Sequence, residues 1–239
     1  MSVDALILCG GLGTRLQGTV PDLPKVLAPV QGKPFLEWLI QFYQHQGITR
    51  FILCTGYRSE QIKIHSQQSV YQDIDICISD ESIQLGTGGA LWKAKSYIQS
   101  SPFLVLNGDT FCDVSIVKSL NIMKEKEPVM LMAMLNQDNA SRYGSIIVDE
   151  DNKIQSFEEK SAIKKSGFIN AGSYMISQTI FEHYIPSKAC FSLEYDVFSY
   201  LSKHKLGMYG MIVDKESFID MGTKDSYEKA NSSFLFPSF

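Results

Sequence analysis

Residues 3–16, VDALILCGGLGTRL, decide the fold. Val3–Cys9 is mostly aliphatic and stops at Gly10-Gly11, which is typical of a buried strand that ends in a tight loop. In an open α/β sheet, ligands bind just beyond the carboxyl ends of the parallel strands. The glycine loop after this strand is therefore the first candidate ligand site.

The chain downstream alternates apolar runs with helical patterns as far as residue 135. This rhythm is typical of βαβ units that build a parallel sheet. The spacing of apolar residues predicts strands and helices in turn over the following segments: strands at Arg50–Thr55, Asp75–Ser79, Phe103–Leu106 and Val129–Leu135, and helices at Pro34–Gln46, Ser59–Ser69, Gly88–Ile98 and 115–126.

The rhythm changes after residue 136, where short strand-like segments joined by polar turns predict antiparallel or mixed pairing. The segments concerned are strands at Ser145–Val148, Ile154–Glu158, Ile169–Ile176, Met208–Val213 and Phe218–Asp220, and helices at Thr179–Tyr184, Tyr195–Ser202 and 225–233. We expect an α/β fold with a Rossmann-like mixed, mostly parallel sheet flanked by helices. Residues 1–239 are expected to form a single domain, with a sublobe from about 136–215.

The composition excludes several classes of function. The chain has 239 residues, a formal net charge of −4 and 44% hydrophobic residues. Binding a nucleic-acid backbone needs a concentrated basic face, so no nucleic-acid partner is expected. No apolar run approaches the roughly 18 residues of a membrane span, and Ala5–Cys9 lacks the basic flank of a signal peptide. We therefore expect no membrane partner and a cytoplasmic location.

Neither the cysteines nor the histidines form a recognisable metal or catalytic pattern. The five cysteines, Cys9, Cys54, Cys77, Cys112 and Cys190, are widely spaced and are expected to be reduced, with most of them buried as small hydrophobes. The four histidines, His45, His65, His183 and His204, lie in polar helical stretches and are expected on the surface.

Two glycine clusters are the strongest candidates for phosphate and nucleoside binding. Glycines in residues 10–13 let backbone N–H groups close on an anion, and Arg15 and Lys25 add cations suited to a triphosphate. The order of residues matches neither the dinucleotide fingerprint GxGxxG nor the P-loop GxxxxGK[ST]. Residues 85–90, LGTGGA, would let a flat base or ribose approach the backbone, although a helix entry also often contains Gly and Thr.

Acids at strand ends indicate a divalent cation. Asp109, in NGDT, and Asp220, in FIDMGT, each follow a short apolar strand. Mg²⁺ takes one or two carboxylates together with substrate phosphates, so the pair predicts a shared metal. Each acid alone would fit a turn or helix cap equally well. Asp113 and Asp138 are expected to be surface residues.

A group of polar residues in the middle third is suited to a sugar phosphate. Glu158-Glu159-Lys160 ends a strand, Asn170-Ala171-Gly172 interrupts another, and Ser192-Leu193-Glu194 opens a helix. Asn and Glu side chains hydrogen-bond sugar hydroxyls, and a lysine can meet a phosphate. Ser192 also fits an ordinary helix N-cap.

In this order, GGLGTRL, LPK, LGTGGA, NGDT, EEK, NAG, SLEYD and FIDMGT resemble the sugar-1-phosphate nucleotidyltransferases over nearly the whole chain. The resemblance implies a catalytic domain that uses Mg²⁺ to transfer a nucleoside monophosphate from an NTP to a sugar 1-phosphate. It implies catalytic roles for Arg15, Lys25, Asp109 and Lys160, and metal binding by Asp109 and Asp220. It implies nucleotide binding by Leu8, Gly10, Gly11, Gly13, Thr14, Arg15, Lys25, Gly86, Thr87, Gly88, Asn107 and Gly108. It implies sugar-phosphate binding in the sublobe by Gly144, Glu159, Lys160, Asn170, Gly172 and Glu194.

Within the family, the resemblance favours GTP and D-glycero-α-D-manno-heptose 1-phosphate as substrates. Guanylyl transfer to mannose 1-phosphate and uridylyl or thymidylyl transfer to another hexose 1-phosphate stay open, although Ser161 stands where thymidylyltransferases commonly have proline. A non-catalytic nucleotide-sugar-binding protein is the alternative from another class. An oxidoreductase would need an acid after the second strand, where Thr55-Gly56-Tyr57 stands, and a glycosyltransferase a DxD-like pair. The sequence is compatible with a homo-oligomer, and Phe234, Leu235, Phe236 and Phe239 could cover the body or a second subunit.

Overall fold

A computed structural model gives the structure of residues 3–16, 18–138, 145–158 and 166–237. Its central sheet is built around β1 (Asp4–Leu8), which lies between β4 (Arg50–Thr55) and β6 (Phe103–Asn107). β5 (Asp75–Asp80) pairs with β4, and these four strands are parallel. The parallel half predicted from the βαβ rhythm is therefore confirmed.

The second half of the sheet is mixed. β11 (Gly167–Ile176) runs antiparallel to β6, and β8 (Met130–Gln137) runs antiparallel to β11. β12 (Met208–Ile212) is parallel to β8, so both again run in the direction of β1. β9 (Ser145–Val148) and β10 (Ile154–Glu158) complete this side. The sheet is thus mixed and mostly parallel, as predicted.

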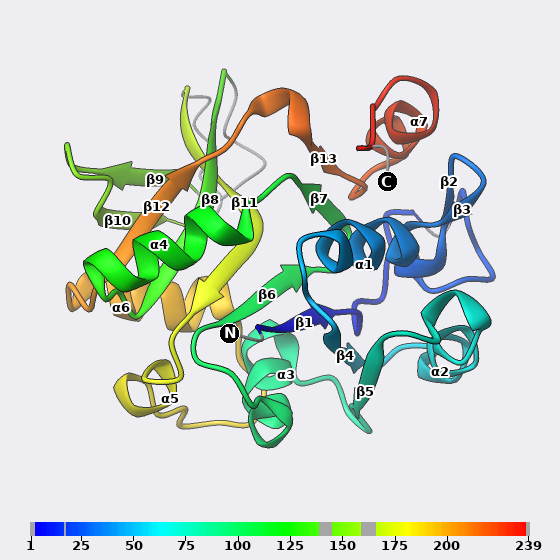
Figure 1. Ribbon diagram of the computed structural model, residues 1–239, viewed down its shortest axis with the longest axis horizontal. Coiled ribbons are helices and arrows are strands. Elements are labelled where there is room, and N and C mark those ends of the chain that lie inside the picture. The colour runs from blue at the N-terminus through cyan, green and yellow to red at the C-terminus, as the bar shows by residue number, and fades with distance from the viewer. Residues whose placement is uncertain (1–2, 17, 139–144, 159–165, 238–239) are drawn as a thin grey trace.

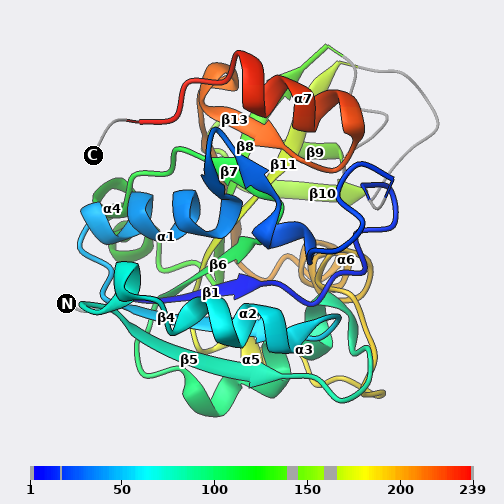
Figure 2. The same ribbon diagram turned by 90° about the vertical axis from the view of Figure 1, so that its right-hand side faces the viewer.

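Helices cover both faces of the sheet. Successive side chains of a strand point to opposite faces, so apolar strands leave both faces to be covered. In β1, Ala5 and Ile7 join one core and Leu6 joins the other. The first core packs against α1 (Phe35–His45), α2 (Ser59–Ser66) and α4 (Ile116–Lys126). The second packs against α3 (Gly86–Ala94), α5 (Ile180–His183), the π-helix Leu193–Phe198 and α6 (Ser199–Lys203). In Figure 1, α1 and α4 lie in front of the sheet, and Figure 2 shows α1 above β1 and α3 below it.

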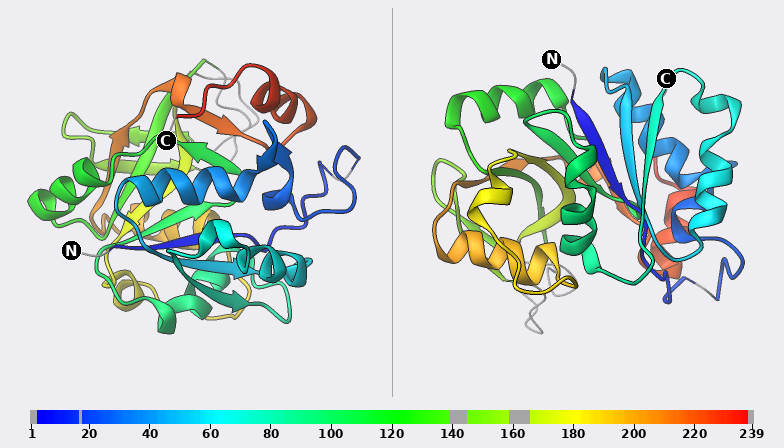
Figure 3. Two further views of the ribbon diagram at one scale, coloured as in Figure 1. Left: turned by 45° about the vertical axis from the view of Figure 1, so that its right-hand side comes forward. Right: turned by 90° about the horizontal axis from the view of Figure 1, so that it is seen from below.

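Two small sheets were not predicted. β7 (Thr110–Cys112) pairs antiparallel with β13 (Phe218–Asp220), and β2 (Pro29–Val30) pairs with β3 (Lys33–Pro34). The strand Phe218–Asp220 was predicted, but its partner β7 and the strands β2 and β3 are too short to show a hydrophobic period. Figure 3 shows α7 (Lys224–Ser232) beside the β2–β3 hairpin, with which it makes contact.

The C-terminal tail packs on the body of its own chain. Phe234 is buried, and the Phe236 ring stacks on Trp38 with centroids 4.2 Å apart. The rings of Phe234 and Phe236 also contact Phe111 of β7 edge-on, with centroid distances of 5.8 and 5.1 Å. Leu235 stays exposed, and Phe239 lies outside the described residues. Of the two expectations for the tail, the structure supports packing on the body.

His65 corrects the expectation of surface histidines. Its side chain is buried between α1 and α2, where Nε2 lies 3.0 Å from the Tyr71 hydroxyl and 3.3 Å from Glu37 Oε1. Hydrogen-bond partners of this kind make a buried imidazole tolerable. In the described part of the chain, no helix is both long and apolar enough to cross a bilayer.

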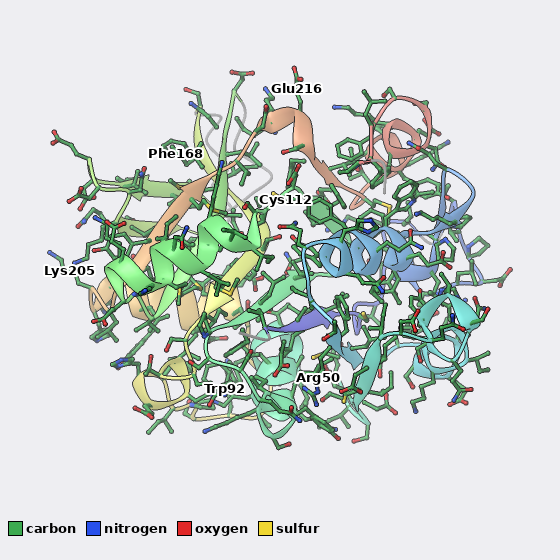
Figure 4. The ribbon with its side chains drawn as sticks, viewed as in Figure 1. Arg50, Trp92, Cys112, Phe168, Lys205 and Glu216 are labelled. Atoms are coloured by element: carbon green, nitrogen blue, oxygen red, sulfur yellow. The ribbon has the colours of Figure 1, made fainter. Side chains whose placement is uncertain are left out.

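The cysteines differ sharply in accessibility. Cys9, Cys54 and Cys112 are buried, Cys77 is half-buried and Cys190 is exposed, and all are free thiols. Cys112, labelled in Figure 4, is the last residue of β7. Burial raises the pKa of Cys54 to about 12. Burial likewise raises the pKa of Cys112 to about 12. Only a thiolate reacts readily, so these groups are inert in the native protein.

We expect Cys190 to react first with Ellman's reagent at pH 8, and Cys77 more slowly. Cys9, Cys54 and Cys112 should react only after the protein is unfolded in guanidinium chloride. Mass spectrometry of the labelled peptides checks the order. Rapid labelling of Cys54 in the native protein would contradict the burial described here.

Candidate active site

A cavity of about 260 Å³ opens where the parallel strands end. Because Leu8 is in register with both Cys54 of β4 and Asn107 of β6, the segments that follow these strands converge at one edge of the sheet. The cavity brings together most of the predicted nucleotide-binding residues with one of the two predicted metal ligands: Leu8, Gly10, Gly11, Lys25, Gly86, Thr87, Asn107, Gly108 and Asp109.

Gly108 sets the position of the acidic side of this cavity. Its N–H donates to the Leu8 carbonyl oxygen at 3.1 Å. A Cβ at this position would lie 2.5 Å from that oxygen and 2.7 Å from Val26 Cγ1, which is closer than any side chain can come. Only glycine lets β6 continue past β1 at this distance, so the side chain of the next residue, Asp109, enters the cavity.

Asp109 and Lys25 form an ion pair at this side of the cavity. Lys25 Nζ lies 2.5 Å from Asp109 Oδ2, and Thr110 Oγ1 donates to Oδ1 at 3.2 Å. Burial alone would raise the pKa of Asp109, but the charge and hydrogen bond of Lys25 outweigh that effect and lower it. Arg15, exposed on the glycine loop, lowers the pKa of Asp109 further by its charge. The carboxylate is therefore ionised at neutral pH.

Asp220 lies beside Asp109 across the β7–β13 pair. It is in register with Thr110, and the Met221 N–H donates to the Asp109 carbonyl oxygen at 2.8 Å. Gly222 N–H donates to Asp220 Oδ1 at 2.6 Å, which fixes that carboxylate at the strand end. The backbones of the two residues thus adjoin, and one or two carboxylates can hold a cation that takes its other ligands from phosphates and water. Within the described ranges no three His, Cys, Asp or Glu side chains gather as a closed metal cage.

The second glycine cluster has a partly different role from the predicted one. Gly86, with φ of +74°, lines the cavity, but Gly88 does not. The N–H groups of Gly88 and Gly89 donate to the Phe191 carbonyl oxygen, and a Cβ on Gly88 would lie 2.4 Å from the Phe191 ring. Glycine at residue 88 thus lets α3 pack closely against Phe191, and this position is not part of the cavity wall.

Thr87 links this wall to the π-helix. Its Oγ1 donates to Glu194 Oε2 at 2.8 Å and accepts from the Leu193 N–H at 2.9 Å. Ser192 Oγ donates to the same Glu194 oxygen at 2.6 Å and also caps the helix, as its N-cap interpretation predicted. Glu194 therefore lies behind the cavity wall and contacts it through Thr87.

The other predicted sugar-phosphate residues divide into two groups. Gly172 lies against Asn107, since a Cβ there would be 2.9 Å from Asn107 Nδ2, and Asn170 Oδ1 accepts from the Gly172 N–H at 2.9 Å. The Asn170 amide also donates to the Tyr174 hydroxyl at 2.8 Å. The structure brings this bulge of β11 to the cavity edge. Gly144, Glu159 and Lys160 lie outside the described residues.

Gly13, Thr14 and Arg15 stand outside the cavity, on the outward part of the first glycine loop. Asp113 and Asp138 are exposed, as expected.

Sequence reasoning missed several residues of the cavity: Cys9, Val26, Cys54, Glu81, Gln84 and Ala90. Glu81 directly follows β5, and its Oε2 accepts from the Leu85 N–H at 2.9 Å. Burial raises the pKa of Glu81, and the bond from Leu85 offsets part of that effect. The position of an acid after a parallel strand, which singled out Asp109, would have singled out Glu81 as well.

Residues 4–235 match the nucleotidyl transferase family. The chain belongs to this family. A D-glycero-alpha-D-manno-heptose 1-phosphate guanylyltransferase from Campylobacter jejuni is 36% identical over 225 residues, which cover 94% of this chain and 97% of that protein. A protein of the same name from Aneurinibacillus thermoaerophilus is 37% identical over 230 residues, which cover 95% of this chain and 96% of that protein.

Similar solved structures agree with membership of the nucleotidyl transferase family. HddC from Yersinia pseudotuberculosis has a TM-score of 0.83 at 33% identity, covering 98% of this chain and 100% of that one. HddC complexed with GMP-PN has a TM-score of 0.82 at 34% identity. A putative glucose-1-phosphate thymidylyltransferase from Bacillus anthracis, with a TM-score of 0.84 at 20% identity, shares the fold.

Replacing Gly108 with alanine should destabilise this nucleotidyl transferase by about 1–3 kcal/mol, because the new methyl group overlaps the Leu8 carbonyl and Val26. Gly18→Ala is the matched control, since no atom lies within 4 Å of a Cβ there, and it should change stability by less than about 0.5 kcal/mol. Urea denaturation of both variants measures the difference. Equal stability of the two variants would contradict the close approach of β6 to β1.

Proposed function

We propose that the protein transfers GMP from GTP to D-glycero-α-D-manno-heptose 1-phosphate and releases pyrophosphate. The observation that carries this proposal is the Lys25–Asp109 ion pair at the mouth of a glycine-walled cavity, with Asp220 beside it. Relatives that cover nearly the whole chain are heptose 1-phosphate guanylyltransferases, and the similar HddC was solved with GMP-PN, which supports the choice of sugar and base.

The reaction needs positioning more than a chemical base. An oxygen of the sugar phosphate attacks the α-phosphorus of GTP in line; the new P–O bond forms as the bond to the pyrophosphate oxygen breaks. The attacking group is already an anion, so no Ser, Cys or His is required to activate it. The barrier is the approach of two polyanions, which donors fixed in place before the reaction lower.

We assign the cations and glycines of the cavity to the nucleotide. Gly10, Gly11 and Gly13 would offer backbone N–H groups to the phosphates, with Arg15 and Lys25 neutralising their charge. Asn107 supports this assignment: its Oδ1 is buried at the cavity without a hydrogen-bond partner among the described residues. A hydroxyl of the bound ligand would satisfy this acceptor, which would otherwise be costly to bury.

Asp109 and Asp220 are the residues that would hold Mg²⁺, because their backbones adjoin at the strand ends and Mg²⁺ takes one or two carboxylates together with substrate phosphates. The ion would supply positive charge to the phosphate oxygens. Lys25 pairs with Asp109 and keeps that carboxylate directed at the cavity.

We assign the sugar phosphate to the sublobe of residues 136–215. The β11 bulge at Asn170 and Gly172, which adjoins Asn107, and Glu194, which adjoins Thr87, support this side of the cavity as the second substrate site. We also assign Gly144, Glu159 and Lys160 to the sugar phosphate, on the basis of the sequence motifs alone. A cytoplasmic location is part of it, because free thiols persist in a reducing compartment.

A matrix of GTP, UTP, TTP and CTP against heptose, mannose and glucose 1-phosphates tests the substrates, with pyrophosphate release as the readout. We expect the highest kcat/KM for GTP with D-glycero-α-D-manno-heptose 1-phosphate in the presence of Mg²⁺. A higher value for mannose 1-phosphate would change the assigned sugar. No release from any pair would support a non-catalytic nucleotide-sugar-binding protein instead.

Lys25→Ala and Asp109→Asn should each lower kcat by about 10²–10³, the usual effect of removing a group that stabilises the transition state. The matched control is Asp138→Asn, which breaks an exposed 3.0 Å ion pair to Lys215 and should leave the rate unchanged. Steady-state kinetics and thermal denaturation of all three variants separate catalysis from folding. Wild-type rates in both cavity variants would contradict their assigned roles.

A further inference from the structure

Gln31 has a backbone conformation that is unfavourable for a glutamine. It forms, with Gly32, the two-residue turn between β2 and β3, in which Val30 pairs with Lys33. The φ angles of the two turn residues are +48° and +87°. Turns of this kind favour Asn, Asp or Gly at both positions, because a longer side chain is disfavoured in the left-handed region. A residue held in such a conformation points to contacts that compensate for it.

Those contacts join Gln31 to the C-terminal end of α7, 199 to 203 positions later in the chain. The Gln31 N–H donates to Asn231 Oδ1 at 3.0 Å. The side-chain Nε2 donates to the carbonyl oxygens of Ala230 and Phe234, both at 2.7 Å. The last carbonyls of a helix have no partner within the helix, so the glutamine amide supplies donors that the end of α7 lacks.

Further contacts hold both the hairpin and the helix on this side of the molecule (Figure 3). The Tyr227 hydroxyl of α7 donates to the Pro29 carbonyl oxygen at 2.6 Å. Trp38 of α1 donates its Nε1–H to the Val30 carbonyl oxygen at 2.9 Å. We call the hydrogen bonds between the β2–β3 hairpin and residues 227–234 the clasp.

The two segments that the clasp joins both lead to the cavity. Lys25 lies in the 3-10 turn Lys25–Leu27, which only Ala28 separates from β2. On the other side, residues 221–223 connect Asp220 to α7. None of the residues of the clasp, all of which the structure describes, lines the cavity. The clasp therefore acts on the site only through the segments to which it is attached.

We infer that Gln31 is a positioning residue for the proposed transfer: it holds the hairpin on α7 and so sets the position of the Lys25 ammonium beside Asp109. Lys25 Nζ lies 2.5 Å from Asp109 Oδ2, and only 11% of the lysine side chain is exposed, so a small movement of its turn displaces the ammonium. A displacement of about 1 Å can lower a rate by about 10²-fold. This inference rests on the role in transfer proposed for Lys25.

Gln31→Glu and Gln31→Lys form the pair of variants that tests it. Both side chains are long and equally disfavoured in the turn, but a carboxylate has no donor for the two carbonyls and an ammonium has three. A negative charge is also unfavourable at the C-terminus of a helix, where a positive charge is favourable. We expect Gln31→Glu to lower kcat about 10-fold with little change in KM, because Lys25 acts in the transition state. Gln31→Lys should keep kcat within about twofold of the wild type.

Gln178→Glu is the matched control. The Gln178 Nε2 donates to the Ser100 carbonyl oxygen at 3.1 Å, ahead of the start of β6 and thus at the edge of the sheet opposite the cavity. This variant should keep the wild-type kcat whatever its effect on the midpoint of thermal denaturation, which separates positioning from stability. Wild-type kcat in Gln31→Glu, or an equal loss in Gln31→Glu and Gln31→Lys, would overturn the inference.

Gln31→Asn replaces Gln31→Glu if the latter does not fold. Asparagine is favoured in the turn, but its side chain is one methylene shorter and cannot reach both carbonyls. We expect the same loss of kcat in this variant, and wild-type kcat would overturn the inference.

Hydrogen exchange followed by mass spectrometry gives a readout that needs no substrate. The N–H groups of Leu27 and Ala28 donate to the carbonyl oxygens of Pro24 and Lys25 at 2.8 and 3.1 Å, and they should exchange faster in Gln31→Glu than in the wild type or in Gln31→Lys. Unchanged exchange of these amides would overturn the inference. Failure of the wild-type protein to use any nucleoside triphosphate would instead overturn the proposed function, whereas the exchange rates would still show whether Gln31 holds the turn.

Discussion

The contact between Gly108 and the Leu8 carbonyl is the constraint on which the site depends. It fixes how far β6 extends past β1, and so the point at which the glycine loop leaves one strand and Asp109 leaves the other. Lys25 can then meet Asp109 at 2.5 Å, because the loop returns over the end of the same strand. A shift of one residue in this register would turn each side chain to the opposite face and separate the pair.

The charge at the site depends on a few side chains and does not follow the net charge of the whole chain. The net charge is −4, yet the proposed ligands are both polyanions. Lys25 and the backbone of residues 10 and 11 line the cavity, Arg15 stands outside it on the same loop, and Asp109 and Asp220 would bind a cation.

Long elements and motifs were predictable from the sequence, whereas contacts made by single residues were not. The strand Arg50–Thr55 has the predicted bounds because six residues show a clear apolar run between turn residues. Strand β7 is too short for such a pattern and is defined by its partner more than 100 positions later. His65 lies in a polar stretch, and its burial depends on Tyr71 and Glu37 from neighbouring elements. Glu81 resembles an ordinary turn acid in the sequence, and only the fold brings it to the cavity.

The C-terminal segment, residues 218–237, supports the proposed site although none of its described residues lines the cavity. Asp220 reaches Asp109 only through the two-stranded β7–β13 sheet, which is too small to be stable by itself. The Phe111 side chain of β7 is held by Phe234 and Phe236 from the end of the chain, and Phe236 is held in turn by Trp38 of α1. These rings supply the apolar contacts that the small sheet lacks. The pairing of the two proposed metal ligands therefore depends on aromatic packing behind them, and a substitution at the tail would act on the site without touching a substrate.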